Sequence, residues 1–592
     1  MKKTITMPLI YLILITLIIP GVSAVNTDNW PMFHHDQSRT GYSSSQAPNT
    51  ATIIWNTTIT SVVNSSPVFG KGRLFIGSED GKLYFFDADP SDGVDEGLTD
   101  PSGSSADLIL TFSTDAPIRS SPLYYNGKVY FGSMNGKVYC IYACIGARIW
   151  EYNTSGAVTS SPVIGNNRIY IGSYDGKLYC IDAETGEHIW DYQTDGAVSS
   201  SPAYNDNKVY FSSHDSYVYC LYASNGTLIW RYRTSDAVQS SPVVTDDKVI
   251  VGSNDGNVYC LYKRNGSASW IYNTNGNAPV RSSAAVAYDK VFVGSDNGDL
   301  YCLYLSNGSL SWSYNTSGEI VSSPAIADGK VYFGSHDGSI YCLNASDGGY
   351  LWGFSSGAVV SSSPAVVNQR LYCADENGNL YCFRNLRSPY TPSIINGPVE
   401  GILGTEYEFS TRTSDPEDDA IYYMFDWGDG KNTSWIGPFN QSERVKATHK
   451  WSVEGYYHIR VKARDSYGCE SEWSEPLTIH IQILSIKTIR GGLGLHITIK
   501  NLGSRKVWNI GYNVTVVGGY IINLANEGFK GEILNIDAGG EESILIGPFF
   551  QLGRVKIIVN IKDRDNTNNV SSEVYAFTLG FLIFCANPNP YV

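Results

Sequence analysis

Short alternations of apolar and polar residues recur over most of the first 385 residues, at an interval of about forty residues. Residues 160–190, SSPVIGNNRIYIGSYDGKLYCIDAETGEHIW, show one such unit. Its β-branched and aromatic runs flank an Asp-Gly pair, which is typical of a hairpin with a type I′ turn. A period near forty, with four short strands per unit and no helical periodicity, predicts a β-propeller.

The Ser-Ser-Pro segment at the start of each unit gives a count of eight blades. Its last residue is Pro67, Pro122, Pro162, Pro202, Pro242, Ala284, Pro324 or Pro364. The fourth strand carries an aromatic residue, which the spacing places at Trp55, Phe112, Trp150, Trp190, Trp230, Trp270, Trp312 and Trp352. The first of these precedes every Ser-Ser-Pro, and the last unit ends without a fourth strand. Residues 53–58, IIWNTT, are therefore predicted to complete the last blade and close the ring, which leaves no open strand edge at the seam.

The repeats resemble the pyrroloquinoline-quinone-type (PQQ-like) propellers. The resemblance rests on AETGEHIW at residues 183–190, ASNGTLIW at 223–230 and the N-terminal WPMFHHDQSRTGYS at 30–43. A WD-repeat propeller is the weaker alternative, because only Trp190-Asp191 gives its dipeptide. The resemblance implies either a quinone-dependent dehydrogenase or a non-catalytic binding propeller.

Two further domains are predicted after the proline-punctuated segment that begins at Arg387. Residues 389–482 contain YYMFDWGDG, HKWSVEGYYHIRVKARD and SEWSEP, and they resemble a polycystic-kidney-disease (PKD) domain, an immunoglobulin-like β-sandwich. Residues 483–592 alternate in the same way and resemble adhesion-related (CARDB-type) modules. The predicted fold is thus all-β: an eight-bladed β-propeller closed by an N-terminal strand, followed by two β-sandwich domains.

Seven cysteines share one position in the repeat, and Phe85 stands there in the first blade. They are Cys140, Cys180, Cys220, Cys260, Cys302, Cys342 and Cys382. A position that accepts Phe or Cys is predicted to be buried and apolar, and equivalent positions in different blades are too far apart for a disulfide. A bridge between Cys373 and Cys382 across the last hairpin is left open. The tryptophans are expected to pack between blades.

The net charge limits the partners that the protein can bind, and the N-terminal residues indicate its compartment. The net charge is −15, and no basic cluster follows Lys2 and Lys3, so a nucleic acid is excluded as a partner. Residues 1–24 read as a signal peptide, with two lysines, an apolar run and Val-Ser-Ala before the cleavage point. The mature propeller would then span residues 25–388. We expect a secreted or cell-surface protein with no transmembrane span beyond the signal segment.

One insertion suggests a metal site. Residues 87–97, DADPSDGVDEG, combine carboxylates with glycines, and flexible oxygen-rich loops suit calcium. The candidate ligands are Asp89, Asp92, Asp95 and Glu96. A solvated acidic loop is the alternative, and no other cofactor is expected.

The expected function is non-catalytic binding or scaffolding. The chain has no Cys-Cys pair, and its forty-residue units leave no room for the long inserts that the quinone dehydrogenases carry. The rival class is an exported enzyme, either a quinone-dependent dehydrogenase or a carbohydrate-active hydrolase or lyase. The partner would be a protein or a cell-surface polysaccharide. The residue before each Ser-Ser pair and the tip of each Asp-Gly hairpin should share one face, and the predicted anchors on it are Arg119, Arg281, Tyr174, His214 and His336.

Overall fold

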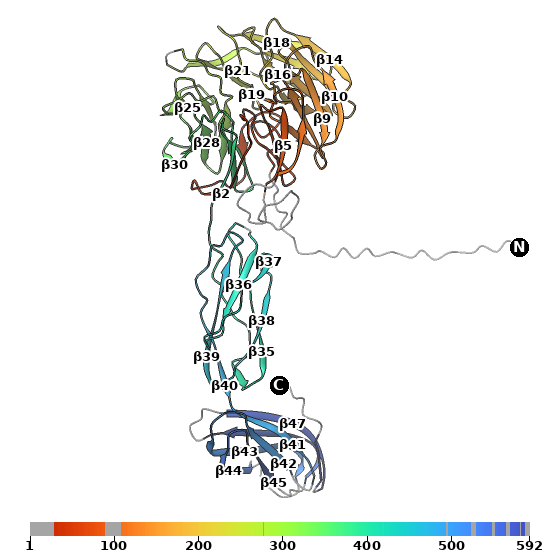
Figure 1. Cartoon of the computed structure of the whole chain (residues 1–592), viewed down its shortest axis with the longest axis vertical. Coiled ribbons are helices and arrows are strands. Elements are labelled where there is room, and N and C mark those ends of the chain that lie inside the picture. The colour runs from red at the N-terminus through yellow and green to blue at the C-terminus, as the bar shows by residue number, and fades with distance from the viewer. Residues whose placement is uncertain are drawn as a thin grey trace, which may run out of the picture. The chain divides into compact units, whose positions relative to one another are not determined.

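The computed structural model divides the chain into two compact units, Met1–Asn385 and Leu386–Val592. The structure describes residues 29–88, 108–275, 277–417, 419–492, 495–521, 529–546, 551–563, 569–580 and 582–585. The described residues form strands and turns, and none of them belongs to a helix that could cross a membrane (Figure 1). The predicted signal peptide lies outside the described residues.

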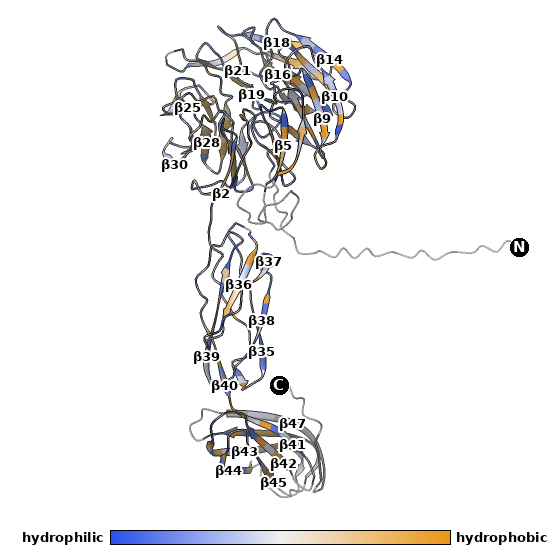
Figure 2. Ribbon diagram, viewed as in Figure 1, coloured by the Kyte–Doolittle hydropathy of each residue, from blue (hydrophilic) through white to orange (hydrophobic). Residues whose placement is uncertain are grey.

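Over the described residues, the first unit contains eight sheets, each with four antiparallel strands in up-and-down order, and β1 (Tyr42–Ser43) adds a fifth, parallel strand beside β27 in blade 7. Blade 1 has β3 (Val68–Gly70), β4 (Arg73–Gly77), β5 (Lys82–Asp87) and β6 (Leu108–Ser113); blade 2 has β7 (Leu123–Tyr125), β8 (Lys128–Ser133), β9 (Lys137–Tyr142) and β10 (Arg148–Asn153); blade 3 has β11 (Val163–Gly165), β12 (Arg168–Gly172), β13 (Lys177–Asp182) and β14 (His188–Gln193); blade 4 has β15 (Ala203–Asn205), β16 (Lys208–Ser212), β17 (Tyr217–Tyr222) and β18 (Leu228–Arg233). Blade 5 has β19 (Val243–Val244), β20 (Lys248–Gly252), β21 (Asn257–Tyr262) and β22 (Ala268–Asn273); blade 6 has β23 (Ala285–Ala287), β24 (Lys290–Gly294), β25 (Asp299–Tyr304) and β26 (Leu310–Asn315); blade 7 has β27 (Ala325–Ala327), β28 (Lys330–Gly334), β29 (Ser339–Asn344) and β30 (Tyr350–Ser355); blade 8 has β31 (Ala365–Val367), β32 (Arg370–Ala374), β33 (Asn379–Arg384) and β2 (Ile53–Thr58). The second and third strands of each blade are almost wholly buried. Figure 2 shows the contrast between hydrophobic strands such as β16 and the more hydrophilic outer strands such as β18.

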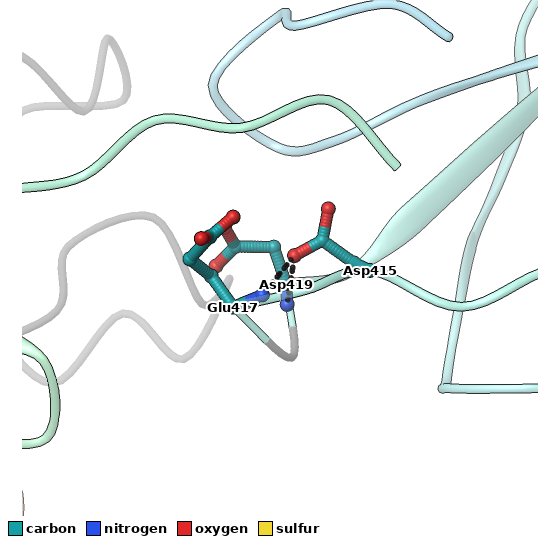
Figure 3. Close-up of side chains that lie close together, drawn as sticks. All are labelled: Asp415, Glu417 and Asp419. Carbon is teal, nitrogen blue, oxygen red and sulfur yellow. Dashed lines mark hydrogen bonds between the residues drawn. The ribbon is translucent and has the colours of Figure 1, made fainter. Parts of the chain in front are cut away.

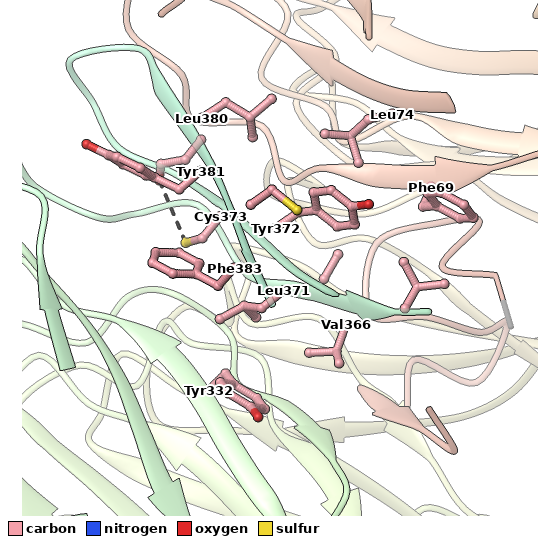
Figure 4. Packing of buried hydrophobic residues seen from close by; sticks show 14 of the residues in the cluster. Phe69, Leu74, Tyr332, Val366, Leu371, Tyr372, Cys373, Leu380, Tyr381 and Phe383 are labelled. Carbon is pink, nitrogen blue, oxygen red and sulfur yellow. Dashed lines mark hydrogen bonds between the residues drawn. The ribbon is translucent and has the colours of Figure 1, made fainter. Parts of the chain in front are cut away.

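The N-terminal strand closes the last blade, as the repeat count predicted. Strand β2 pairs antiparallel with β33, with Trp55 opposite Cys382. Side chains of blades 1, 7 and 8 form one core here, including Phe69, Tyr332 and Tyr372 (Figure 4). Strand pairing and side-chain packing between the two ends of the propeller therefore close the ring, without a covalent bond.

A closed ladder of serine hydrogen bonds explains the recurrent Ser-Ser pair. In every blade the backbone N–H of the second serine donates to the Oγ of the second serine in the next blade, at 2.9–3.0 Å. The last of these bonds runs from Ser363 back to Ser66. Eight such bonds complete the circle, so the ladder independently gives eight blades.

The tryptophans dock between neighbouring blades. The Nε1–H of Trp190 donates to the carbonyl oxygen of Ala223 at 3.1 Å, and its indole packs against Gly226. Gly226 has a φ of +72°, and a Cβ there would lie 2.6 Å from the ring, so this position requires glycine. One sequence assignment was wrong. In blade 1 the docking position is Leu110, which lies opposite Phe85, whereas Phe112 lies two residues further along the strand.

The cysteines are packing residues. The seven equivalent side chains are buried, and burial raises the pKa of Cys180 to about 12, so its thiol is not a reactive one. The bridge that was left open is not formed. Cys373 lies opposite Tyr381 and Cys382 lies opposite Tyr372, so the two sulfurs point to different faces of the sheet.

In the described part of the second unit, the strands form two pairs of sheets with separate cores. The first pair consists of β34 (Glu400–Ile402), β36 (Ile421–Asp426), β37 (Ile436–Phe439), β39 (Gly455–Arg464) and β40 (Leu477–Gln482), facing β35 (Glu406–Thr411) and β38 (Val445–Lys450). The second pair consists of β41 (Leu484–Arg490), β42 (Leu495–Asn501) and β45 (Glu541–Ile546), with β43 (Val507–Ile521), β44 (Phe529–Ile536), β46 (Gln551–Lys562), β47 (Asn569–Gly580) and β48 (Leu582–Cys585). Trp427, Trp451 and Phe409 lie in the core of the first sandwich.

Candidate functional site

The two predicted sets of variable residues meet on one face of every blade. The N–H of each hairpin tip donates to the carbonyl oxygen two residues before the variable residue of the same blade, as Tyr174 does to Ala157 at 2.9 Å. The same bond recurs in all eight blades. We call these sixteen residues the ring face: Asn64, Glu79, Arg119, Met134, Thr159, Tyr174, Ser199, His214, Gln239, Asn254, Arg281, Asp296, Val321, His336, Ser361 and Glu376.

Side chains of the ring face bind one another within a blade. Asn64 Nδ2 donates to Glu79 Oε1 at 2.9 Å, and Arg281 Nε donates to Asp296 Oδ2 at 2.6 Å. Ser199 Oγ lies 2.8 Å from His214 Nε2. The variable residue and the hairpin tip therefore form one surface.

Further contacts join neighbouring blades. Arg119 Nε donates to Glu79 Oε1 at 2.6 Å, and Arg281 Nη2 donates to Glu319 Oε2 at 3.0 Å. The rings of Tyr174 and His214 meet edge to face, with centroids 6.0 Å apart. The ring face is thus a connected polar belt over several blades rather than a set of independent turns.

The electrostatics of the belt follow from these pairs. The hydrogen bond to Glu79 raises the pKa of Arg119, and that to Asp296 raises the pKa of Arg281. Burial raises the pKa of the Asp296 carboxyl, although Arg281 opposes the shift. Burial also lowers the pKa of His214. Both predicted arginine anchors are therefore already neutralised by carboxylates of the protein, while Tyr174 remains half exposed.

One group in the belt places a serine, a histidine and a carboxylate in contact with one another, as in the catalytic triad of serine hydrolases. Ser361 Oγ lies 3.1 Å from His336 Nε2, and His336 Nδ1 lies 3.5 Å from Glu319 Oε2. Ser361 Oγ also donates to Glu376 Oε1 at 2.6 Å. Because the hydroxyl hydrogen is directed at Glu376, His336 does not accept it in this arrangement. The histidines therefore have contacts that the sequence alone did not reveal.

Below the ring face, the segment Trp30–Ser45 runs along the first strands of the blades. Its backbone carbonyl oxygens accept N–H groups from blades 1, 2, 4, 5, 6 and 7, and Ser45 Oγ accepts the N–H of Gln369 in blade 8. Arg39 completes the set, because its fully buried guanidinium donates to the carbonyl oxygens of Ser161 and Pro162 in blade 3. We call residues 30–45 the plug segment, since this single stretch contacts all eight blades.

Two buried groups of the plug segment have shifted pKa values. Burial lowers the pKa of Arg39 to about 9 and that of His34 to about 4. His34 Nδ1–H donates to the carbonyl oxygen of Arg39 at 3.2 Å, which opposes the pKa shift, and burial of the ring is what favours its neutral form.

The predicted calcium ligands Asp89, Asp92, Asp95 and Glu96 lie outside the described residues. The structure instead gathers Asp415, Glu417 and Asp419 in one loop of the PKD-like sandwich, with their carboxylate oxygens within 4.8 Å of one another (Figure 3). Asp415 Oδ1 accepts the N–H groups of Glu417 and Asp419, at 2.8 and 3.2 Å. Sequence reasoning missed this group, although carboxylates at alternate positions 415, 417 and 419 were visible.

The conspicuous carboxylates of the DWGDG motif have structural roles. Asp429 accepts the N–H of Lys431 at 3.1 Å and its other oxygen lies 3.0 Å from His449 Nε2. Asp426 accepts the N–H of Gly428 at 3.0 Å. They form the tight turn that the glycines predicted.

Comparison with family models agrees with this architecture. Residues 39–190 match the model of the outer membrane protein assembly factor BamB, and residues 164–385 match that of the beta-propeller of the beta-alanine-activating enzyme. Residues 396–475 match the PKD domain. The first unit is a PQQ-type β-propeller, and the chain carries a PKD domain after it. No curated protein matches the chain.

Solved structures share the propeller fold at low identity. Quinohemoprotein alcohol dehydrogenase from Comamonas testosteroni is 15% identical with a TM-score of 0.52, covering 64% of this chain and 84% of that one. A europium-containing methanol dehydrogenase is 11% identical with a TM-score of 0.51, covering 60% of this chain and 89% of that one. Likeness at these identities concerns the fold alone.

Proposed function

We propose that the protein is an exported, non-catalytic binding or scaffold protein whose ring face is the surface that meets the partner. The PKD domain and the C-terminal sandwich would act as spacer or adhesion modules. The partner would be a protein or a cell-surface polysaccharide.

One observation carries this proposal: the ring face combines a repeated backbone with side chains that differ from blade to blade. The same tip-to-carbonyl bond fixes all eight positions, while the side chains at the tips include Glu79, Tyr174 and His214. A rigid frame with a varied surface lowers the entropic cost of ordering a binding site. Arginine and aromatic residues, both present here, are enriched among residues that dominate interface energies.

The compartment is supported by the architecture. One matching family model is that of an outer membrane protein assembly factor, and the predicted signal peptide fits export. Both observations support the proposal that the protein acts outside the cytoplasm, as a secreted or cell-surface protein.

Site-specific photo-crosslinking in cells tests the proposal. A photoreactive residue at Tyr174 on the ring face should give a defined crosslinked product, whereas one at Ser224 should not. Ser224 is exposed in the turn after β17, on the opposite face, where Ala223 N–H binds the carbonyl oxygen of Asn207. The product should disappear when Arg119→Ala is combined with Arg281→Ala. Equal crosslinking from both faces would contradict the ring face as the binding surface.

An exported hydrolase is the second candidate. Its support is the chain of contacts in which the Ser361 hydroxyl meets the His336 ring and the ring meets the Glu319 carboxylate. A fluorophosphonate probe that labels Ser361, and fails to label the Ser361→Ala variant, would favour this candidate over the binding protein. The quinone-dependent alternative predicts stoichiometric binding of added quinone, measured by absorbance and mass.

A further inference from the structure

The turn between the third and fourth strands of blades 4, 5 and 6 carries an Asn-Gly-Thr or Asn-Gly-Ser triplet. Asn225, Asn265 and Asn307 occupy the same place in the three turns, and each of them is exposed. Asn-x-Ser/Thr is the acceptor sequence for N-glycosylation, which modifies surface loops of secreted proteins. The three turns lie on the side opposite the ring face, because β17, β21 and β25 each begin after a hairpin tip of the ring face and end at one of these turns.

The fold explains the glycine of the triplet but not the residue that follows it. The glycine packs against the tryptophan of the preceding blade, as Gly226 does against Trp190. The residue after this glycine is Ala147 in blade 2, Glu187 in blade 3 and Gly349 in blade 7, so the turn accepts very different side chains there. The hydroxyl residue in blades 4, 5 and 6 is therefore not required by the turn.

Hydrogen bonds within the triplet orient the asparagine amide. In blade 5 the N–H and the hydroxyl of Ser267 both donate to Asn265 Oδ1, at 3.2 and 3.0 Å. In blade 6 Ser309 makes the same two bonds to Asn307 Oδ1, at 3.0 and 2.9 Å. The backbone bond recurs at Asn225 in blade 4, at 3.1 Å. Each Oδ1 is thus turned toward its own loop, and among the described residues none accepts a hydrogen bond from the three Nδ2 groups.

Two other Asn-x-Ser/Thr triplets of the propeller have their asparagine amide bound to the protein. Asn64 lies on the ring face, where its Nδ2 donates to Glu79 Oε1 at 2.9 Å, and Ser66 of its triplet is buried in the serine ladder. The Nδ2 of Asn315 donates to Asp299 Oδ1 at 2.9 Å. The structure therefore distinguishes triplets that share the same sequence pattern.

Exposed apolar side chains flank the turns that carry the available triplets. Tyr222 and Leu228 lie on either side of the triplet in blade 4 and are 49% and 38% exposed. Tyr304 and Leu310 hold the same places in blade 6 and are 44% and 43% exposed. Exposed apolar surface favours association with other molecules, and a hydrophilic sugar chain beside it would shield it.

We propose that Asn225, Asn265 and Asn307 are N-glycosylation sites, so that three consecutive blades carry sugar chains on the side opposite the ring face. The inference rests on the proposed export of the protein. In the transfer, Asn Nδ2 forms a bond to the anomeric carbon of a sugar held on a lipid phosphate. The bond from that carbon to the phosphate oxygen breaks, and the amide proton leaves with the released lipid phosphate. Sugar chains in these positions leave the ring face open to a partner.

Glycopeptide mass spectrometry of the full-length protein, purified from the cells that naturally produce it, tests the three sites. Asn225, Asn265 and Asn307 should each carry a sugar mass in the majority of molecules, whereas Asn64 should carry none. Unmodified asparagines at the three sites would overturn the proposal. The same spectra identify the mature N-terminus, so they show separately whether the protein has been exported.

Two changes at one serine give a matched pair of variants. Ser267→Ala removes the hydroxyl that the acceptor sequence requires, so it should abolish the sugar at Asn265 and leave those at Asn225 and Asn307 in place. Ser267→Thr keeps a hydroxyl and should keep the sugar. Ser267 is exposed, so both variants should fold. A sugar that persists at Asn265 in Ser267→Ala, or equal occupancy at Asn64 in the unaltered protein, would contradict the assignment.

Discussion

In the propeller, the buried backbone N–H of the second serine of each blade is satisfied by the next blade, whereas the PKD domain gathers carboxylates in a single loop. The serine ladder repeats one hydrogen bond eight times, and each copy supports its neighbours. In the PKD domain, buried oxygens of Asp415 and Asp465 have no protein donor. The comparison shows that a repeat can satisfy its buried backbone groups internally, whereas burial in the single-copy cluster raises the pKa of the Asp415 carboxyl to about 6.

Removing the closing strand is the severest way to break this arrangement. Deletion of residues 49–60 removes β2 and Trp55, so blade 8 loses its outer strand and the core of blades 1, 7 and 8 is opened. We expect aggregation or a large loss of stability, measured by calorimetry and size-exclusion chromatography. A truncated protein that melts within about 2 °C of the intact one would contradict closure, since even about 1 kcal/mol moves a midpoint by a few degrees.

The tryptophan docks should behave as equivalent copies. Trp190→Ala removes a buried indole and its bond to Ala223, at an expected cost of about 3–5 kcal/mol. Trp230→Ala should cost nearly the same, because Trp230 has the same burial and donates to Lys263 in the next blade. Chemical denaturation measures both. Costs that differ severalfold would show that the blades are not equivalent.

Low pH should destabilise the folded protein through His34 of the plug segment. The folded-state pKa of His34 is lowered to about 4, below its unfolded value of 6.5, so folding favours the neutral ring. Its contribution is therefore complete above about pH 6.5 and is lost as the pH falls toward 4, by up to about 3 kcal/mol. Unfolding midpoints measured across this range should fall less steeply in His34→Gln. The matched control is His188→Gln at an exposed histidine, which should retain the full pH dependence.

Removing one hydrogen bond of the serine ladder should cause the smallest loss of stability. Ser201→Ala leaves the buried N–H of Ser161 without its acceptor, which costs about 1–3 kcal/mol. Ser199→Ala, two residues away on the ring face, should cost less because its hydroxyl is only part-buried. Equal losses in the two variants would mean that the ladder contributes no more than an ordinary surface hydrogen bond.

Repetition explains why most of the propeller could be predicted from sequence. Each Ser-Ser pair, Asp-Gly turn and tryptophan was seen several times, so the period determined the blades and the two faces. Phe112 was misassigned because blade 1 has Leu110 at the docking position and supplies no tryptophan to fix the register. The contacts of His336 could not be predicted, since they join residues of different turns and blades. The carboxylates at positions 415, 417 and 419 were visible in the sequence, but nothing in it showed that their side chains turn toward one another.

Removing two ring-face arginines is the sharpest test of whether the ring face binds the partner. The affinity of the crosslinked partner should be measured for the unaltered protein, for Arg119→Ala with Arg281→Ala, and for a control with Arg148→Ala and Arg231→Ala on the outer strands β10 and β18. The control removes the same number of positive charges from exposed positions away from the ring face. We expect the double change on the ring face to weaken binding at least about tenfold, as for interface arginines, and the control to leave the affinity unchanged. Unchanged affinity in the ring-face variant, together with loss of binding after changes around Ser224, would contradict the claim.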